Sequence, residues 1–427
     1  MRDHLPAGAV SRSVRVLGPV VLLGALAFYL AAYLRWPSLA GQVDLLVYRF
    51  GATRVWDGQD LYSMGMTGNP HTLLFDYTPF AALCFLPLIG LSQPVILTLG
   101  LLVNIACVGY IVRRMLTAAG IGGVTGSWGL TALLIALVVW LEPVRLSLQL
   151  GQINVVIMAI VIADVLSQPS RRWAGIGIGI AAGIKLTPAL FIVFLIATGR
   201  RREAVIAGLT FMSTIAVGFI LLPADSSEFW LGGRFQDVRR ISSDPLANTS
   251  LAGLLARLDW ATRWKTAIAV LFAIFAIAVA AAAWRRGHLL LGLAIAGMTS
   301  AAASPFSWSH HWVWFAPLLV HLGVLGFVYR SRAAALAMWT LAAIFGGWFI
   351  ASRSSPPEAG LMSLRRAGMW DQLLPAAYLF ALGIVLLCSV YAIWRARQRP
   401  AAEAIGVDAM MASTRPHASI GLDRFPS

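Results

Sequence analysis

Charged residues are scarce in this chain. Asp, Glu, Lys and Arg make up only 12% of its 427 residues, whereas 59% are apolar and the mean hydropathy is +0.77. A soluble protein of this length needs far more charge on its surface, so a soluble fold is excluded. The composition predicts an all-α, polytopic membrane protein.

Cysteines are also few, and each of them lies within an apolar run. They are Cys84, Cys107 and Cys388. We interpret them as small buried residues, and we expect neither a disulfide nor a metal site.

We expect no cleavable leader. Arg12 and Arg15 precede an apolar run, as they would in a signal peptide, but the run extends from Val16 to Leu34. It ends in Arg35-Trp36-Pro37 without a small-residue cleavage site. This length predicts a retained first span.

Acidic residues are outnumbered by basic ones, 18 against 33, which gives a net charge of +15. The basic residues are spread between the apolar runs and form no continuous patch, so nucleic-acid binding is excluded. We expect them to orient the chain in the membrane first and to attract anionic membrane lipids second.

Long apolar runs are abundant, and we expect about ten of them to cross the membrane as helices of one bundle. They are Val16–Leu34, Gln93–Val112, Ser127–Leu141, Ile153–Leu166, Ala204–Leu222, Thr266–Trp284, Leu289–Ala303, Trp312–Tyr329, Ala333–Ile350 and Leu374–Trp394. Two stretches differ. Pro79–Leu91 is too short to cross and predicts a re-entrant segment, and Trp173–Ala197, interrupted at Lys185-Leu-Thr-Pro188, predicts a hairpin of two short helices.

The arginine clusters determine the expected topology. With the re-entrant segment and the hairpin in place, every cluster between apolar runs falls on the cytoplasmic side. This predicts a cytoplasmic N-terminus over residues 1–15, a transmembrane domain over 16–398 and a disordered cytoplasmic tail over 399–427. The loops near residues 35–78, 142–152, 223–265, 304–311 and 351–371 then face out of the cell, across the plasma membrane.

The first outward loop contains an expected helix that presents one carboxylate. Asp44, Tyr48 and Gly51 have i, i+4 and i+7 spacing, which places them on one face of an amphipathic helix along the membrane surface. A lone aspartate in a loop is more often solvated or a helix cap, and this alternative remains open beside a functional role.

Amides and a further carboxylate gather in the second outward loop. Glu142-Pro143 ends one helix, with Arg145 close behind it, and Gln152 and Asn154 stand at the mouth of the next helix. Carboxylates and planar amides hydrogen-bond to sugar hydroxyls, so this loop is a candidate sugar site. Two well-capped helix ends are the alternative.

Lys185 lies within apolar sequence, where an ammonium at a helix centre costs about 2.5–3.5 kcal/mol. A wet cavity at the apex of the hairpin would lower this cost, and the ammonium would then suit a lipid phosphate. Snorkelling of the side chain to the interface is the alternative.

Two adjacent histidines, His310 and His311, follow the helix breaker Pro305. Neighbouring residues on a helix point about 100° apart and no third ligand has motif spacing, which disfavours a zinc pair. An imidazole that donates to a phosphate fits better. There are two alternatives. Both histidines belong to the aromatic belt at the membrane interface, or one is catalytic and the other is structural.

Taken together, these motifs resemble glycosyltransferase family 87, the polyprenyl-phosphate-mannose-dependent α-mannosyltransferases of mycobacteria and relatives, which have a GT-C-type membrane fold. The matching pieces are Val43-Asp44-Leu-x-Val-Tyr48, Tyr77-Thr-Pro79-Phe-Ala-Ala, Glu142-Pro-x-Arg145, Gly151-Gln-Ile-Asn-Val155, Gly183-x-Lys-Leu-Thr-Pro188 and Ser304-Pro-x-Ser-Trp-Ser-His-His-Trp-Val-Trp314. Where relatives read Tyr-Pro-Pro, this chain has Tyr77-Thr78-Pro79.

The resemblance implies an inverting, metal-independent transfer of mannose, without a cofactor, from a β-linked polyprenyl phosphate to a lipid-anchored mannoside. Asp44 matches the family's first-loop aspartate, a general base that takes the proton of the acceptor hydroxyl. The leaving phosphate needs cations or hydrogen bonds, which Lys185, a histidine and an outer arginine would supply. The implied substrate-binding residues are Tyr48, Tyr77, Glu142, Arg145, Gln152, Asn154, Lys185, Asn248, His310, His311 and Trp312.

The sequence leaves alternatives in function. Broken helices and charge at mid-membrane depth also occur in transporters, so a polyprenyl-linked sugar or lipid transporter is the second hypothesis. No internal repeat is visible, which favours the transferase. The expected linkage is α-1,2, and the acceptor is a phosphatidylinositol mannoside or lipomannan, with Trp56–Tyr62 and Asn248–Gly253 leaning toward lipomannan. The sequence determines no oligomeric state.

Overall fold

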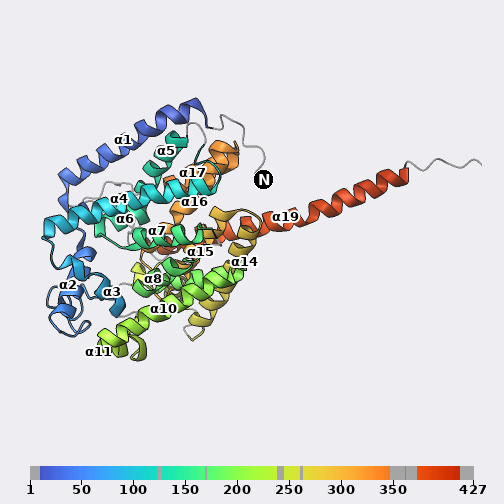
Figure 1. Ribbon diagram of the computed structural model, residues 1–427. Coiled ribbons are helices and arrows are strands. Elements are labelled where there is room, and N and C mark those ends of the chain that lie inside the picture. The colour runs from blue at the N-terminus through green and yellow to red at the C-terminus, as the bar shows by residue number, and fades with distance from the viewer. Residues whose placement is uncertain are drawn as a thin grey trace, which may run out of the picture.

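The described part of the chain folds into helices, as its composition predicts (Figure 1). In this computed structural model the described residues are 10–123, 127–168, 171–237, 245–259, 263–346, 361 and 373–413. Within these ranges no strand occurs, and pairing of extended backbone is limited to one antiparallel bridge between Leu141 and Gly346.

The α-helices vary widely in length. They are α1 (Arg12–Arg35), α2 (Val43–Trp56), α3 (Pro79–Cys84), α4 (Gln93–Ala118), α5 (Ser127–Trp140), α6 (Glu142–Leu150), α7 (Asn154–Val165), α8 (Ile176–Ile184), α9 (Leu190–Ala197), α10 (Arg201–Leu221), α11 (Pro223–Ser226), α13 (Leu251–Arg257), α14 (Lys265–Arg285), α15 (Leu289–Ala302), α16 (Phe315–Gly323), α17 (Arg332–Ile344) and α19 (Ala377–Ser413). Short 3-10 and π segments connect them: η1 (Pro37–Ala40), η2 (Leu86–Leu88), η3 (Thr187–Ala189), η4 (Ser227–Leu231), η5 (Arg234–Gln236), η6 (Pro245–Ala247), η7 (Ser309–Trp314), η8 (Val324–Val328) and η10 (Leu374–Ala376).

The number of full spans is smaller than the sequence suggests. In the described ranges six helices are long and apolar enough to cross a membrane, or seven if the bent pair α6 and α7 is one span. The expected count of about ten is therefore not confirmed. The reason is length: α5 and α15 have 14 residues and α17 has 13, which gives about 20 Å against a hydrocarbon core of about 30 Å.

Three further expectations concern the re-entrant segment, the C-terminal tail and one outward loop. The predicted re-entrant segment is divided into α3, with 6 residues, and η2, with 3, and neither is long enough to span. The predicted disordered tail begins at residue 399, whereas α19 continues as a helix to Ser413. Most of the predicted outward loop 351–371 lies outside the described residues.

The predicted hairpin around Lys185 is confirmed. The backbone of Lys185 is extended (φ −142°, ψ 132°) and separates α8 from η3 and α9. Successive glycines of α8 lie against successive residues of α10, Gly179 beside Ala207 and Gly183 beside Thr214, so the two helices run parallel. Because α9 lies between them in the chain, it must return antiparallel, and Lys185 is at the apex.

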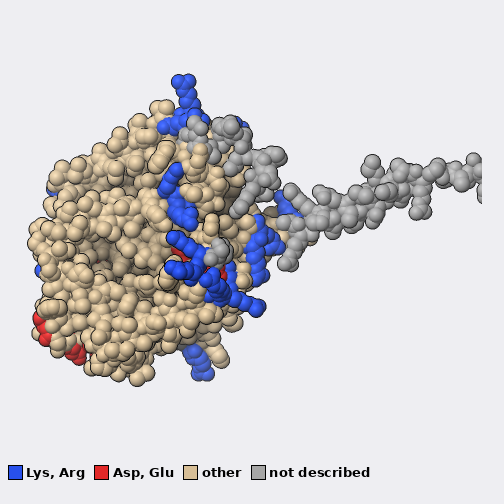
Figure 2. Space-filling view, viewed as in Figure 1, with Lys and Arg blue, Asp and Glu red and all other residues tan. Residues whose placement is uncertain are grey.

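Arginines bind together several helix ends at the base of this hairpin. Arg200 donates to the carbonyl of Val165 at 2.5 Å, and Arg114 donates to that of Leu166 at 2.5 Å. Arg285 donates to the carbonyl of Ala197. Three of the arginine clusters therefore lie at one level, as the predicted topology requires. Figure 2 shows the main group of Lys and Arg near the middle of the view, whereas a group of Asp and Glu lies at the lower left edge, where Figure 1 places α2 and α11.

The close approach of α8 to α10 predicts a stability effect. A methyl group on Gly179 would lie 2.5 Å from Cβ of Thr210 and 2.6 Å from the carbonyl oxygen of Ala207, so the helices would have to separate. Small residues are what allow such contacts between membrane helices. We expect Gly179→Ala to destabilise the protein by about 1–3 kcal/mol, measured as a lower Tm in detergent.

Gly208→Ala is the matched control, because Gly208 lies in α10 and a methyl group there meets nothing within 4 Å. Its Tm should stay the same or rise slightly, since Ala favours a helix over Gly by about 1 kcal/mol. Equal Tm values for the two variants would contradict the close packing of α8 on α10.

Candidate active site

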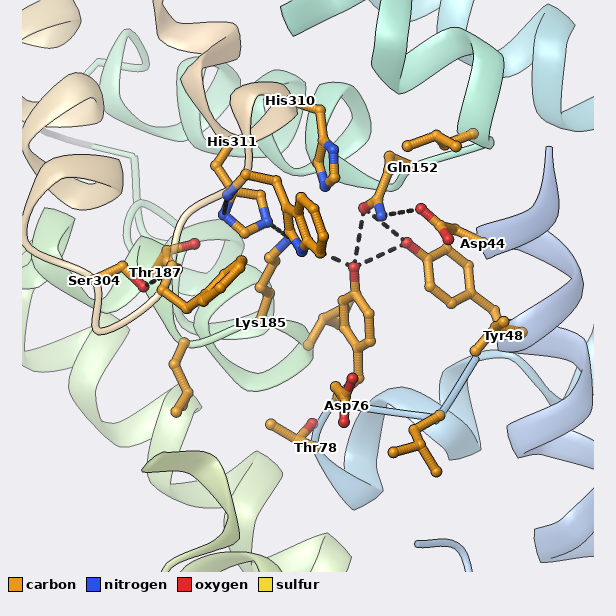
Figure 3. Close-up of a pocket in the computed structure, with 18 of the residues that line it drawn as sticks. Asp44, Tyr48, Asp76, Thr78, Gln152, Lys185, Thr187, Ser304, His310 and His311 are labelled. Carbon is orange, nitrogen blue, oxygen red and sulfur yellow. Dashed lines mark hydrogen bonds between the residues drawn. The ribbon is translucent and has the colours of Figure 1, made fainter. Parts of the chain in front are cut away.

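A cavity of about 550 Å³ lies between α2, the segment before α3, α6, the break at Lys185 and the loop that leads into η7. Seven of the residues selected from the sequence line it: Asp44, Tyr48, Tyr77, Gln152, Lys185, His310 and His311. Figure 3 shows Asp44, Tyr48 and Gln152 on one side of the cavity and Lys185 and His311 on the other. The structure thus brings together side chains from five separate segments.

Asp44 lies in the first turn of α2, which follows the span α1 and precedes the span α4 in the chain. The start of α2 is anchored by the buried Gln42, whose backbone N–H donates to Gln149 O at 2.9 Å and whose side chain donates to Leu97 O at 2.6 Å. The Asp44 carboxylate accepts a hydrogen bond from Nε2 of Gln152. Burial raises the pKa of Asp44, while the Gln152 hydrogen bond and the charge of Lys185 act to lower it.

Gln152 links Asp44 to two tyrosines. Its Oε1 accepts from the hydroxyls of Tyr48 at 3.0 Å and Tyr77 at 3.1 Å, and these hydroxyls lie 2.9 Å apart. The ring of Tyr48 stacks on Phe85, with centroids 4.6 Å apart. Gln152 follows Gly151, whose φ of 69° requires a glycine and turns the chain between α6 and α7. The amide is therefore held in one orientation.

Lys185 occupies the opposite side of the cavity. Its Nζ donates to Oδ1 of Asn154 at 2.7 Å and lies 3.2 Å from Nε2 of His311. The Tyr77 hydroxyl is 3.4 Å from Nζ, which connects this side to the Gln152 network. The buried hydroxyl of Thr78 donates to the carbonyl of Gly183 at 2.5 Å and so ties the segment before α3 to the end of α8.

Both ring nitrogens of His311 have polar neighbours. Nδ1 lies 3.3 Å from the backbone nitrogen of Trp308 and 3.3 Å from Oγ of Ser307, and Nε2 faces Nζ of Lys185 at 3.2 Å. In the tautomer with its proton on Nε2, the imidazole and the Lys185 ammonium are two donors on one side of the cavity. An anionic oxygen would satisfy both.

His310 adds another nitrogen to the same side. Its ring is 4.8 Å from that of His311, nearly perpendicular to it, and its buried Nε2 has no hydrogen-bond partner among the described residues. A buried polar atom without a partner is costly and marks a place where a ligand binds. The cavity therefore has a carboxylate on one side and nitrogen donors suited to an anion on the other.

Five residues predicted to bind substrate do not line the cavity: Glu142, Arg145, Asn154, Asn248 and Trp312. All are buried. Glu142 accepts from the backbone of Leu361 at 2.6 Å, and Arg145 donates to Gln149 at 2.9 Å. Both side chains lie on the face of α6 that points away from the cavity, and their hydrogen bonds stabilise the helix there.

Asn248 and Trp312 position the histidine loop. Asn248 donates to Pro305 O at 3.0 Å and accepts from Ser307 N at 3.1 Å, and Trp312 donates to Thr249 Oγ1 at 2.9 Å. Asn154, also predicted to bind substrate, accepts a hydrogen bond from Lys185, which lines the cavity.

Three residues that line the cavity lie outside the motifs found in the sequence. Phe229 and Phe235 reach the cavity from the segment after α10, and His71 from the first loop. The signal that was available is the cluster of aromatic residues Phe229-Trp230 and Phe235 in an otherwise polar loop. Among the described residues no group of three or more His, Cys, Asp or Glu side chains is placed to hold a metal ion.

Comparison with known proteins gives one family. The model of glycosyltransferase family 87 matches residues 75–305. The chain is 30% identical over 396 residues to the polyprenol-phosphate-mannose-dependent alpha-(1-2)-phosphatidylinositol mannoside mannosyltransferase of Mycobacterium tuberculosis, covering 86% of this chain and 90% of that protein. It is 32% identical over 332 residues to the Mycolicibacterium smegmatis protein of the same name, covering 70% and 75%.

A further relative is the polyprenol-phosphate-mannose-dependent alpha-(1-2)-phosphatidylinositol pentamannoside mannosyltransferase of Mycobacterium tuberculosis. It is 30% identical over 346 residues, which cover 78% of this chain and 76% of that protein. No solved structure matches the chain.

The contacts of Asn248 predict a stability effect. Asn248→Ala leaves the buried N–H of Ser307 and the carbonyl of Pro305 without their partner, so we expect a loss of about 1–3 kcal/mol, measured as a lower Tm in detergent. Asn248→Asp retains an acceptor for Ser307 and should lose less. An unchanged Tm for Asn248→Ala would contradict its role in holding this loop.

Proposed function

Because the chain belongs to glycosyltransferase family 87, we propose that it transfers mannose from polyprenyl-phosphate-mannose to a phosphatidylinositol mannoside, with an α-1,2 linkage. The donor, the acceptor and the linkage are those in the names of its relatives. These names favour a phosphatidylinositol mannoside over lipomannan, toward which the sequence leaned. They also favour a transferase over a transporter.

One observation supports this reaction most directly: the cavity sets a single carboxylate, Asp44, across from Lys185, His310 and His311. Transfer with inversion needs a base on one face of the sugar and a place for the leaving phosphate on the other. The network through Gln152 and Tyr77 holds these two sides in a fixed relation.

In the proposed step the acceptor hydroxyl attacks C1 of the mannose while Asp44 takes its proton. The bond between C1 and the phosphate oxygen breaks, and the polyprenyl phosphate leaves with the electron pair. The β-linked donor thereby gives an α-linked product. A phosphate monoester needs no proton to leave, so the ammonium and the imidazole N–H groups act by charge and hydrogen bonding, without a metal ion.

The burial of Asp44 suits this role. General-base catalysis is most efficient when the pKa of the base lies near the working pH, and burial raises the pKa of Asp44 toward it. The hydrogen bond from Gln152 opposes the rise and orients one carboxylate oxygen, so the other is left for the acceptor hydroxyl.

We infer that the cavity faces the extracytoplasmic side of the plasma membrane. Arg114, Arg200 and Arg285 gather at the base of the hairpin, and α8 carries the chain away from them for 9 residues, about 14 Å, before Lys185. Positive residues favour the cytoplasm, which places the cavity toward the other side. A lipid-linked donor is available there.

The test is mannose transfer by purified protein in EDTA, with polyprenyl-phosphate-mannose and a phosphatidylinositol mannoside. We expect activity in the wild type and a loss of about 10²–10⁴ in kcat for Asp44→Asn, since the amide cannot accept the proton. Asp57→Asn, at the exposed far end of the same helix, is the control and should retain activity.

Full activity in Asp44→Asn would remove Asp44 as the base. Activity that EDTA abolishes and a divalent ion restores would contradict the metal-independent reaction. Absence of transfer by the wild type with every mannoside acceptor would return the transporter hypothesis to first place.

The environment of Asp44 also predicts a pH dependence. The base must be deprotonated, and burial raises its pKa, so kcat/KM should rise with pH and reach half its maximum above the pH expected of an exposed aspartate. Gln152→Leu removes a hydrogen bond that lowers this pKa, so the acid limb should move to higher pH. A limb that stays in place would assign it to a group other than Asp44.

A further inference from the structure

One part of the cavity lining has its own chemistry. Phe229 and Phe235 belong to it, together with the exposed side chains of His71 and Asp76. Figure 3 places Asp76 below Gln152 and Lys185, on the side of the cavity opposite His310. None of these residues takes part in the proposed transfer step.

The position of the aromatic pair follows from α10. Phe229 and Phe235 lie in the segment that begins after the end of this helix. The segment folds back along α10, since the ring of Trp230 lies 6.2 Å from that of Phe211. It thereby brings both phenylalanines to the cavity.

This aromatic wall is held firmly against the first loop. Phe229 is 3% exposed and stacks on Tyr62 with centroids 5.8 Å apart. The Tyr62 hydroxyl donates to the carbonyl of Tyr77 at 2.9 Å, and Asp225 accepts from the backbone of Leu61 at 2.9 Å. Arg234 lies over the ring of Tyr62 and pairs with Glu228. The wall is thus joined to the segment that carries Tyr77.

An aromatic face next to a carboxylate and an imidazole suits a pyranose ring. The C–H face of a hexose packs on an aromatic ring, while its hydroxyls hydrogen-bond to the polar groups. The donor has one sugar, and its remainder is a phosphate and an apolar chain. Only the acceptor has a sugar unit beyond the one that reacts, and this unit would lie along the aromatic wall while the reacting hydroxyl is at Asp44.

We propose that Phe235, Phe229 and Asp76 form an outer carbohydrate subsite, which binds the acceptor's mannosyl unit next to the one that receives the new sugar. The assignment rests on the proposed function, because it takes the reacting hydroxyl to be at Asp44. The subsite makes the enzyme select acceptors by the length of their mannosyl chain.

The test compares two acceptors, an octyl α-mannoside and the corresponding octyl dimannoside, in wild type and Phe235→Ala. Phe235 is the residue of choice because it is 37% exposed and its removal disturbs the wall less than that of Phe229. We expect the KM for the dimannoside to rise by about five- to tenfold, with the KM for the monomannoside and for the donor unchanged. Phe235→Tyr should restore the wild-type value.

Phe380→Ala is the matched control, because Phe380 is 54% exposed on α19 and does not line the cavity. It should leave both KM values unchanged. Equal losses with both acceptors in Phe235→Ala would make Phe235 a structural wall residue, and no loss with either would remove it from acceptor binding. Both results overturn the subsite.

Binding without transfer separates this inference from the proposed function. Titration of mannotriose into the protein in detergent, followed by calorimetry without donor, should show binding that Phe235→Ala weakens. If the wild type transfers no mannose but binds mannotriose in this way, the transferase proposal fails, whereas carbohydrate binding at Phe235 is confirmed. If the wild type does not bind mannotriose, the subsite is overturned.

Discussion

The amide of Gln152 is the interaction on which the site depends. Its nitrogen donates to Asp44 and its oxygen accepts from Tyr48 and Tyr77, so one side chain fixes the carboxylate and two phenols from two other segments of the chain. In an interior of low dielectric each of these groups would be costly without a partner. The amide satisfies all three, and through Tyr77 it links them to Lys185.

The cavity exists because helices are broken around it. The chain bends by 118° between α6 and α7 at Gly151, it becomes extended at Lys185, and it forms a 3-10 segment at the histidines. Non-helical backbone at membrane depth is tolerated only where it is buried in protein or lines a cavity. Side chains from other segments satisfy the backbone at these breaks, as the Thr78 hydroxyl does for Gly183 and the Asn154 amide does for His310.

The separation of charge across the cavity gives the proposed reaction its direction. A carboxylate on one side and nitrogen donors on the other, facing across a cavity within the protein, act on the sugar more strongly than they would in water. The same arrangement suits a neutral His311 whose proton is on Nε2, because this tautomer adds a donor beside Lys185 without a second charge.

The sequence by itself determined the features that depend on neighbours along the chain. Hydropathy indicated a membrane protein, Lys185-Leu-Thr-Pro188 indicated the break in the hairpin, and the motif around Asp44 indicated a helix with a carboxylate on one face. Tertiary structure alone decided which side chains share the cavity. Asp44 meets Gln152 across 108 residues and Lys185 meets His311 across 126, so their relation depends on how distant helices pack.

Helix packing also placed some of the predicted residues outside the cavity. Glu142 and Arg145 are near Gln152 in sequence, yet α6 turns them to the back of the cavity, and Phe229 enters it because α10 and Tyr62 direct the following segment inward. The number of full spans was likewise decided by where α5, α15 and α17 end, which hydropathy alone does not determine. Local chemistry specifies where the chain bends and what it presents, and only the packing of helices decides what each side chain faces.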